Sequence, residues 1–78
     1  MLIHGYSFQG DPDGLEYIVT QAEAVEQLVG MVKQNGQAAF LYKETHFIVM
    51  PTPSGSYIVT RAHHGSRGFL GSHLRGLP

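Results

Sequence analysis

The strongest hydrophobic pattern in the chain is that of an amphipathic helix. Apolar side chains recur at intervals of three and four residues, which places them on one helical face: Val25, Leu28, Val29 and Val32. Thr20 and Glu23 have the spacing of a capping box, in which each side chain binds a backbone amide at the start of a helix. Asn35-Gly36 is typical of a helix end. We therefore predict one helix over residues 21–35.

Two segments before this helix have the composition of β-strands. Residues 2–8 alternate unevenly between polar and apolar side chains, and residues 15–19 are rich in aromatic and β-branched side chains. Between them, Gly10-Asp11-Pro12-Asp13-Gly14 combines a proline with glycines, which is typical of a turn. We expect these residues to form a β-hairpin.

Three more strands are predicted after the helix, at residues 38–43, 46–50 and 56–62. Glu44-Thr45 separates the first two, and a loop with two prolines at residues 51–55 precedes the third. The element order is therefore ββαβββ. This order predicts an α+β domain over residues 1–62, in which one amphipathic helix packs on one face of a small antiparallel sheet.

The sequence Tyr-Ile-Val-Thr occurs twice, at residues 17–20 and 57–60. A duplicated strand-to-helix unit would place a second helix near Thr60. True repeats extend over whole structural units of about 20–50 residues, whereas this similarity is short. We favour the interpretation that a β-branched sequence recurs by chance.

Residues 63–78 differ in composition from the rest of the chain. They contain four glycines, which disfavour an isolated helix, together with arginines and histidines. Three leucines nevertheless fall on one helical face: Leu70, Leu74 and Leu77. We interpret this segment as a basic, glycine-rich C-terminal tail that is docked on the domain or ordered by a partner.

The predicted strands after the helix carry more apolar side chains than one helix can cover. Residues 38–42 and 47–50 are apolar at consecutive positions, so both faces of the sheet are apolar. The face away from the helix is predicted to meet the tail, a second subunit or another protein. Four aromatic residues on the sheet and three arginines are predicted to contact a partner: Phe40, Tyr42, Phe47, Tyr57, Arg61, Arg67 and Arg75.

Net charge changes sign along the chain. The 78 residues sum to −1, but the first 44 contain all six acidic residues and both lysines, giving −4. The remaining residues contain three arginines and no acidic residue, giving +3, and four of the five histidines. Opposed charges of this kind orient a partner of complementary charge or a second copy bound head to tail.

Several classes of protein are excluded by what the chain lacks. It has no cysteine, which excludes disulfides and thiolate zinc sites. No apolar run reaches the roughly 18 residues of a membrane span, and the first ten residues contain no lysine or arginine with which a secretory signal begins. We therefore expect a cytoplasmic protein that has no membrane interaction.

Histidines are the main candidates for chemistry. His63, His64 and His73 offer three imidazoles, but their spacing matches no metal site, and we predict neither a metal nor a cofactor. His63 and His64 lie near Arg61 and Arg67 in the sequence, and these are the residue types that acid–base cleavage of RNA requires. A small histidine-dependent ribonuclease is therefore one alternative hypothesis.

A non-enzymatic function fits the apolar sheet and the polarised charge best. Together they predict a small protein-binding module or inhibitor, in which an apolar surface supplies affinity and charge supplies orientation. Domains of this size are common among inhibitors encoded by phages and other mobile elements, an analogy by size alone. The same surface suits a homodimer. The other alternative is a binder of RNA or single-stranded nucleic acid through the C-terminal arginines, glycines and histidines.

Overall fold

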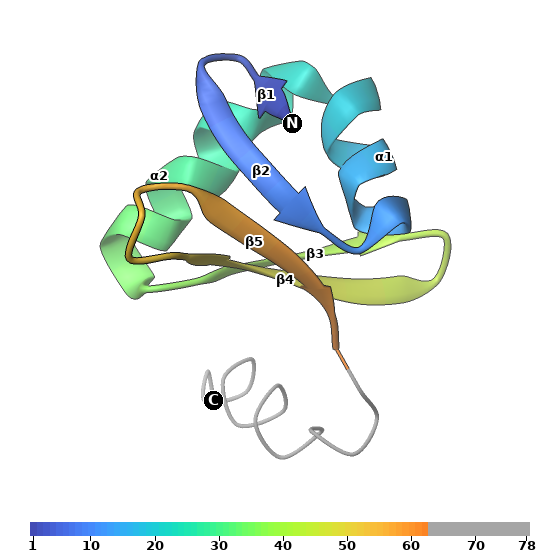
Figure 1. Cartoon of the computed structure of the whole chain (residues 1–78). Helices are drawn as coiled ribbons and strands as arrows, with labels where there is room; N and C mark the ends of the chain where they lie inside the picture. Colours follow the sequence, from blue (N-terminus) through green and yellow to red (C-terminus); the bar gives the residue numbers. More distant parts are fainter. Residues whose placement is uncertain (63–78) are drawn as a thin grey trace.

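The computed structural model describes residues 1–62 (Figure 1). The predictions for the tail, including Arg67, Arg75 and the histidines after residue 62, lie outside the described residues. The described residues form an α+β fold with one five-stranded mixed sheet and two helices. The elements are β1 (Leu2–Ile3), β2 (Tyr6–Gly10), α1 (Pro12–Thr20), a 3₁₀ turn η1 (Ala22–Ala24), α2 (Val25–Asn35), β3 (Ala38–Tyr42), β4 (Thr45–Pro51) and β5 (Tyr57–Arg61).

The strands lie in the order β1-β2-β5-β4-β3. β2 and β5 are parallel, whereas every other neighbouring pair is antiparallel. The prediction of a wholly antiparallel sheet is therefore wrong at its centre. The reason is that the two helices carry the chain from the end of β2 to the far edge of the sheet, and the β3-β4-β5 meander then returns to β2. No helix within residues 1–62 has the length and apolar character needed to cross a membrane.

The first predicted strand is a complete hairpin by itself. β1 and β2 pair antiparallel within residues 2–10, and His4-Gly5 forms the turn between them. Both turn residues have positive φ angles, 53° for His4 and 87° for Gly5. Two consecutive positive φ angles match the twist of a tight hairpin. The hairpin partner that we predicted at residues 15–19 is thus replaced by a local one.

The predicted strand at residues 15–19 is a helix, because α1 runs from Pro12 to Thr20. Asp11 caps this helix, since its Oδ1 accepts a hydrogen bond from the backbone N–H of Asp13 at 3.0 Å. Pro12 suits the first helical position, where no backbone N–H is required. The residues that we predicted to be a turn are therefore a helix start, and this start overrides the strand preference of the residues that follow.

The predicted helix at residues 21–35 is confirmed from Val25 onward, where α2 begins after η1. The predicted capping box is wrong. Thr20 is the last residue of α1, and its hydroxyl donates to the carbonyl of Tyr17 at 3.1 Å instead of capping a new helix. At the other end, Gly36 terminates α2 with a φ angle of 87°, a left-handed conformation that favours glycine.

The three predicted strands after the helix are confirmed as β3, β4 and β5, with a shift in the first turn. Tyr42 pairs with Thr45, so the two-residue loop is Lys43-Glu44 and not Glu44-Thr45. Both loop residues have positive φ angles, 52° and 64°, the combination that a tight hairpin uses. The strands therefore begin and end within a few residues of the prediction.

Both helices pack on the same face of the sheet (Figure 1). The core between them is built from every second residue of the strands and from the inward faces of the helices. Its members are Ile3, Phe8, Ile18, Val25, Leu28, Val29, Val32, Ala38, Phe40, Phe47, Val49, Tyr57 and Val59. All four apolar residues of the predicted helical face are therefore buried, as expected.

Candidate functional site

The aromatic residues that we predicted as partner contacts lie on the helix-covered face of the sheet. Phe40, Phe47 and Tyr57 are buried in the core, with exposed fractions of 9%, 0% and 8%. Tyr42 is half-buried, and its ring lies 5.5 Å from that of Tyr17 on α1. In this conformation these rings stabilise the core and leave little surface for a partner, and partner binding through them stays a prediction.

The aromatic rings form a stacked series between α1 and the sheet. Tyr17 stacks on Phe40 with ring centroids 4.3 Å apart, and Phe40 stacks on Phe47 at 5.3 Å. Pairs at these distances add stabilisation beyond the burial of their area. The series therefore holds α1 against β3 and β4, which is a structural role.

The opposite face of the sheet carries a different set of side chains, which we call the open face. Strand residues alternate between faces, so the neighbours of the core positions point away from the helices. Register places Ala39 beside Ile48 and Ile48 beside Thr60, while Met50 pairs with Ile58. The open face of β3, β4 and β5 consists of Ala39, Leu41, His46, Ile48, Met50, Ile58 and Thr60.

The open face is mostly apolar and carries a single titratable side chain, that of His46. Ile48 lies at its centre and is buried, although it is not part of the core beneath the helices. Leu41 is the most exposed of the apolar side chains on this face, at 58%. Neither α1 nor α2 lies on this face (Figure 1). The second apolar face predicted from the sequence is therefore present, but its apolar side chains are aliphatic, and Leu41 is the exposed one among them while Ala39, Met50 and Ile58 are half-buried.

Arg61, the remaining predicted contact within the described residues, is held by two carboxylates. Its Nε and Nη2 donate to the two carboxylate oxygens of Asp11, each at 3.2 Å, and Nη2 also donates to Asp13 at 3.0 Å. The guanidinium lies over the ring of Phe47, with Cζ 5.3 Å from the centroid. This cluster fastens the end of β5 to the start of α1, so the guanidinium is engaged within the domain.

The environment of Asp11 changes its pKa in two directions. Burial raises the pKa of this carboxyl, but the hydrogen bonds from Arg61 and from the N–H of Asp13 favour the charged form. The net result is a pKa below the usual value for aspartate. The same two aspartates raise the pKa of Arg61. Asp11 is therefore both the cap of α1 and the anionic partner of β5.

A second polar cluster joins the first hairpin to α2. Glu26 accepts a hydrogen bond from the Tyr6 hydroxyl at 3.3 Å, and its other carboxylate oxygen lies 3.2 Å from His4 Nε2. Burial, followed by the charge and hydrogen bond of Glu26, raises the pKa of Tyr6. The cluster contains only two candidate metal ligands, and residues 1–62 contain no group of three or more such side chains.

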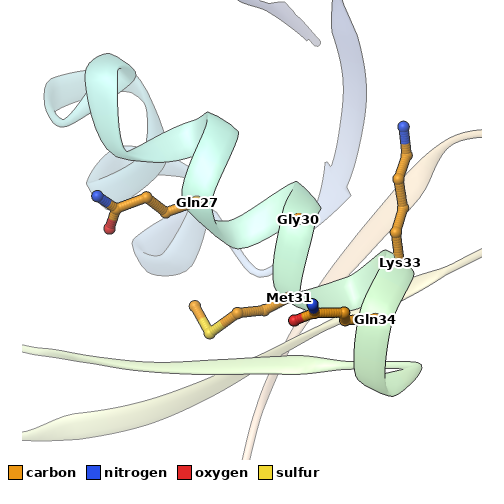
Figure 2. A pocket seen from close by; sticks show the side chains of 5 residues that line it. All are labelled: Gln27, Gly30, Met31, Lys33 and Gln34. Carbon is orange, nitrogen blue, oxygen red and sulfur yellow. The ribbon is translucent and has the colours of Figure 1, made fainter.

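The outer surface of α2 carries a shallow depression of about 530 Å³. Figure 2 shows that Gln27, Met31 and Gln34 extend to one side of the helix, while Lys33 extends away from them. Gly30, which has no side chain, completes the lining. The lining therefore contains two amides, one lysine amine and one thioether, and no carboxylate, imidazole, hydroxyl or thiol.

The sequence signal that distinguishes the two faces is the alternation of side chains along each strand. In β4, Phe47 and Val49 share one face, whereas His46, Ile48 and Met50 share the other. His46 stands at the end of the apolar series on one face of β4. A buried imidazole would need a hydrogen-bond partner, so the histidine indicates the face that the helices do not cover. The aromatic residues were predicted as contacts because one sheet face was expected to lack cover, and the structure places Phe40, Phe47 and Tyr57 on the face that the helices cover.

No protein family, no curated protein and no solved structure matches this chain.

Proposed function

We propose that the chain is a small non-enzymatic protein-binding module that contacts its partner through the open face. The observation that carries this proposal is the position of Leu41, Met50 and Ile58 on a sheet face that neither helix covers. The free energy of the system falls when a partner removes grouped apolar side chains from water. Aliphatic contacts thus supply the affinity for the partner.

Charge indicates the chemistry of the partner. The carboxylates of Asp11, Asp13 and Glu26 pair with groups within the domain, and none of the seven open-face side chains is acidic. Ala62, the last residue that the structure describes, continues β5 beside β4, since it donates its backbone N–H to the carbonyl of His46 at 2.9 Å, and the basic segment follows it in the sequence. The complementary partner is a protein surface with an apolar centre and acidic residues beside it.

The described residues add no support to the two alternatives. Arg61, which both alternatives use, is hydrogen-bonded to Asp11 and Asp13, so binding a phosphate would require breaking these contacts. The ribonuclease hypothesis rests on His63 and His64, which lie outside the described residues. His46 is exposed and Leu41 is its neighbour on β3, so no second acid–base group among residues 1–62 faces it on the adjacent strand.

Site-specific photocrosslinking tests the proposal on the full chain. A photoreactive residue replaces Met50 on the open face in one protein and Gln27 on the outer surface of α2 in a control. We expect Met50 to crosslink a partner protein in extracts of the native host and Gln27 not to do so. The identified partner is then purified, and Met50→Lys is expected to weaken its binding by about tenfold or more, since a charge enters an apolar contact.

Three results would contradict the proposal. Equal crosslinking from Gln27 would show that the open face is not selective. Unchanged affinity of a folded Met50→Lys variant would remove the open face from the contact. Crosslinks from Met50 to residues 63–78 of the same chain alone would show that the chain covers this face itself. Circular dichroism of each variant checks that the fold is retained.

A further inference from the structure

β3 is an edge strand that lacks the usual protection against pairing with another strand. It stands at the end of the sheet order and, within residues 1–62, pairs only with β4. Its five residues, Ala-Ala-Phe-Leu-Tyr, include neither a charged residue nor a proline. The opposite edge, β1, is only two residues long, which is itself protective. The two edges of the sheet therefore differ in their capacity to accept a further strand.

Within residues 1–62, the backbone of β3 has hydrogen-bonding groups without a partner at two positions. In a two-residue hairpin the pair that closes the loop is hydrogen-bonded, and here that pair is Tyr42 and Thr45. Because bonding direction alternates along an antiparallel strand, Ala39 and Leu41 turn their N–H and C=O groups away from β4. These groups lie at the outer edge of the sheet.

We propose that β3 pairs antiparallel with β3 of a second copy of the chain, about a twofold axis at Phe40. In this register Ala39 of one copy lies opposite Leu41 of the other, which is the pairing that brings the outward groups together. Twofold symmetry makes this pair occur twice, and each pair exchanges two backbone hydrogen bonds, so the contact contains four. The result is a continuous sheet across the dimer.

The side chains of β3 are complementary to themselves in this register. Ala39 faces Leu41 of the second copy and Ala38 faces its Tyr42, so at these pairs a small residue meets a large one, while at the axis Phe40 faces Phe40 of the second copy. The nearest charge, Lys43, comes to lie beside Gln37 of the second copy, so no like charges are opposed. An isologous contact requires this self-complementarity, and it favours a second copy over an unrelated strand.

The dimer and the proposed partner binding share Leu41 but can be tested apart, because the half-buried Met50 and Ile58 of the open face lie on β4 and β5, outside the β3 pairing. Sedimentation equilibrium of the full chain is expected to show the mass of two chains at high concentration and of one chain on dilution. Ala39→Pro removes an outward N–H, a position where an edge strand tolerates proline. Leu41→Lys adds an edge charge at a side chain that is 58% exposed.

Both edge variants are expected to sediment as single chains at every concentration. Leu2→Lys on the β1 edge, where the side chain is 74% exposed, and Met50→Lys on the open face are expected to dimerise as the wild type does. A wild-type chain that stays monomeric at millimolar concentration would overturn the proposal. So would a dimer that survives in a folded Leu41→Lys variant, or one that only Met50→Lys dissociates. Partner crosslinking from Met50 is measured separately, so either proposal can fail alone.

Discussion

Gly14 of α1 lies directly against Val59 of β5. A Cβ atom at residue 14 would stand 2.5 Å from Val59 Cγ1 and 3.0 Å from a ring carbon of Phe47. Val59 and Phe47 are completely buried, so neither side chain has free space to move into. The absence of a side chain at residue 14 therefore sets how closely α1 approaches the sheet.

We expect Gly14→Ala to destabilise the protein, although alanine is the better helix former. Overpacking a core costs about 1–3 kcal/mol, and the helix preference of alanine returns at most about 1 kcal/mol. The predicted net change is a loss of up to about 2 kcal/mol in the free energy of unfolding, measured by urea denaturation. Gly30→Ala in α2 is the matched control, because a Cβ atom at residue 30 would have nothing within 4 Å, and it should gain about 0.5–1 kcal/mol. A Gly14→Ala protein as stable as Gly30→Ala would refute the close packing.

The repeated sequence Tyr-Ile-Val-Thr adopts two different structures. Residues 17–20 end α1, whereas residues 57–60 lie in β5. In the helix Ile18 is buried and Val19 is 48% exposed, while in the strand Val59 is fully buried and Ile58 is half-buried. The helix thus buries the isoleucine of the sequence, whereas the strand buries its valine most completely. The residues around each copy therefore decide its structure. The two copies of the sequence have different secondary structures, which agrees with a chance recurrence.

Alanine at the two equivalent valines should have different effects on the free energy of unfolding. Val59→Ala is expected to lower the free energy of unfolding by about 2 kcal/mol, because it removes a fully buried side chain of the core. Val19→Ala is expected to be neutral or to gain up to about 0.5 kcal/mol, because alanine is the better helix former at an exposed site. Both values come from urea denaturation of the full chain. Comparable losses from both substitutions would mean that residues 17–20 do not form a helix with this orientation.

Local patterns predicted those parts of the fold that depend on near neighbours. The buried face of α2 and the three strands of the meander follow from periodicity within each segment. Residues 15–19 were predicted wrongly because their strand preference is weaker than the helix start at Asp11 and Pro12. The parallel pairing of β2 with β5 joins Phe8 to Tyr57, and no local pattern specifies a contact so distant in sequence.

The sequence predicted that the candidate site would be an apolar sheet face, but it did not identify the residues on that face. The apolar runs in β3 and β4 indicated a sheet with two apolar faces, and the structure places Leu41 and Met50 on the face without helices. Which face the helices cover depends on how α1 docks, and α1 was not predicted. Arg61 was expected to be a free contact, because the sequence did not show that Asp11 would lie beside it.

Because of the contact between Arg61 and Asp11, we expect the stability of the fold to depend on pH in the acid range. The folded state lowers the pKa of Asp11, so its contribution to stability is present above the ordinary aspartate value of 3.8 and is lost as pH falls below that value. Arg61→Gln should lower the melting temperature at pH 7, and the difference from wild type should shrink as the pH falls below 3.8. Thermal unfolding followed by circular dichroism from pH 7 to about pH 2 measures this difference, with the exposed Lys33→Gln as the control for loss of a positive charge. A difference between wild type and Arg61→Gln that stays constant to the acid limit would show that the ion pair with Asp11 does not stabilise the fold.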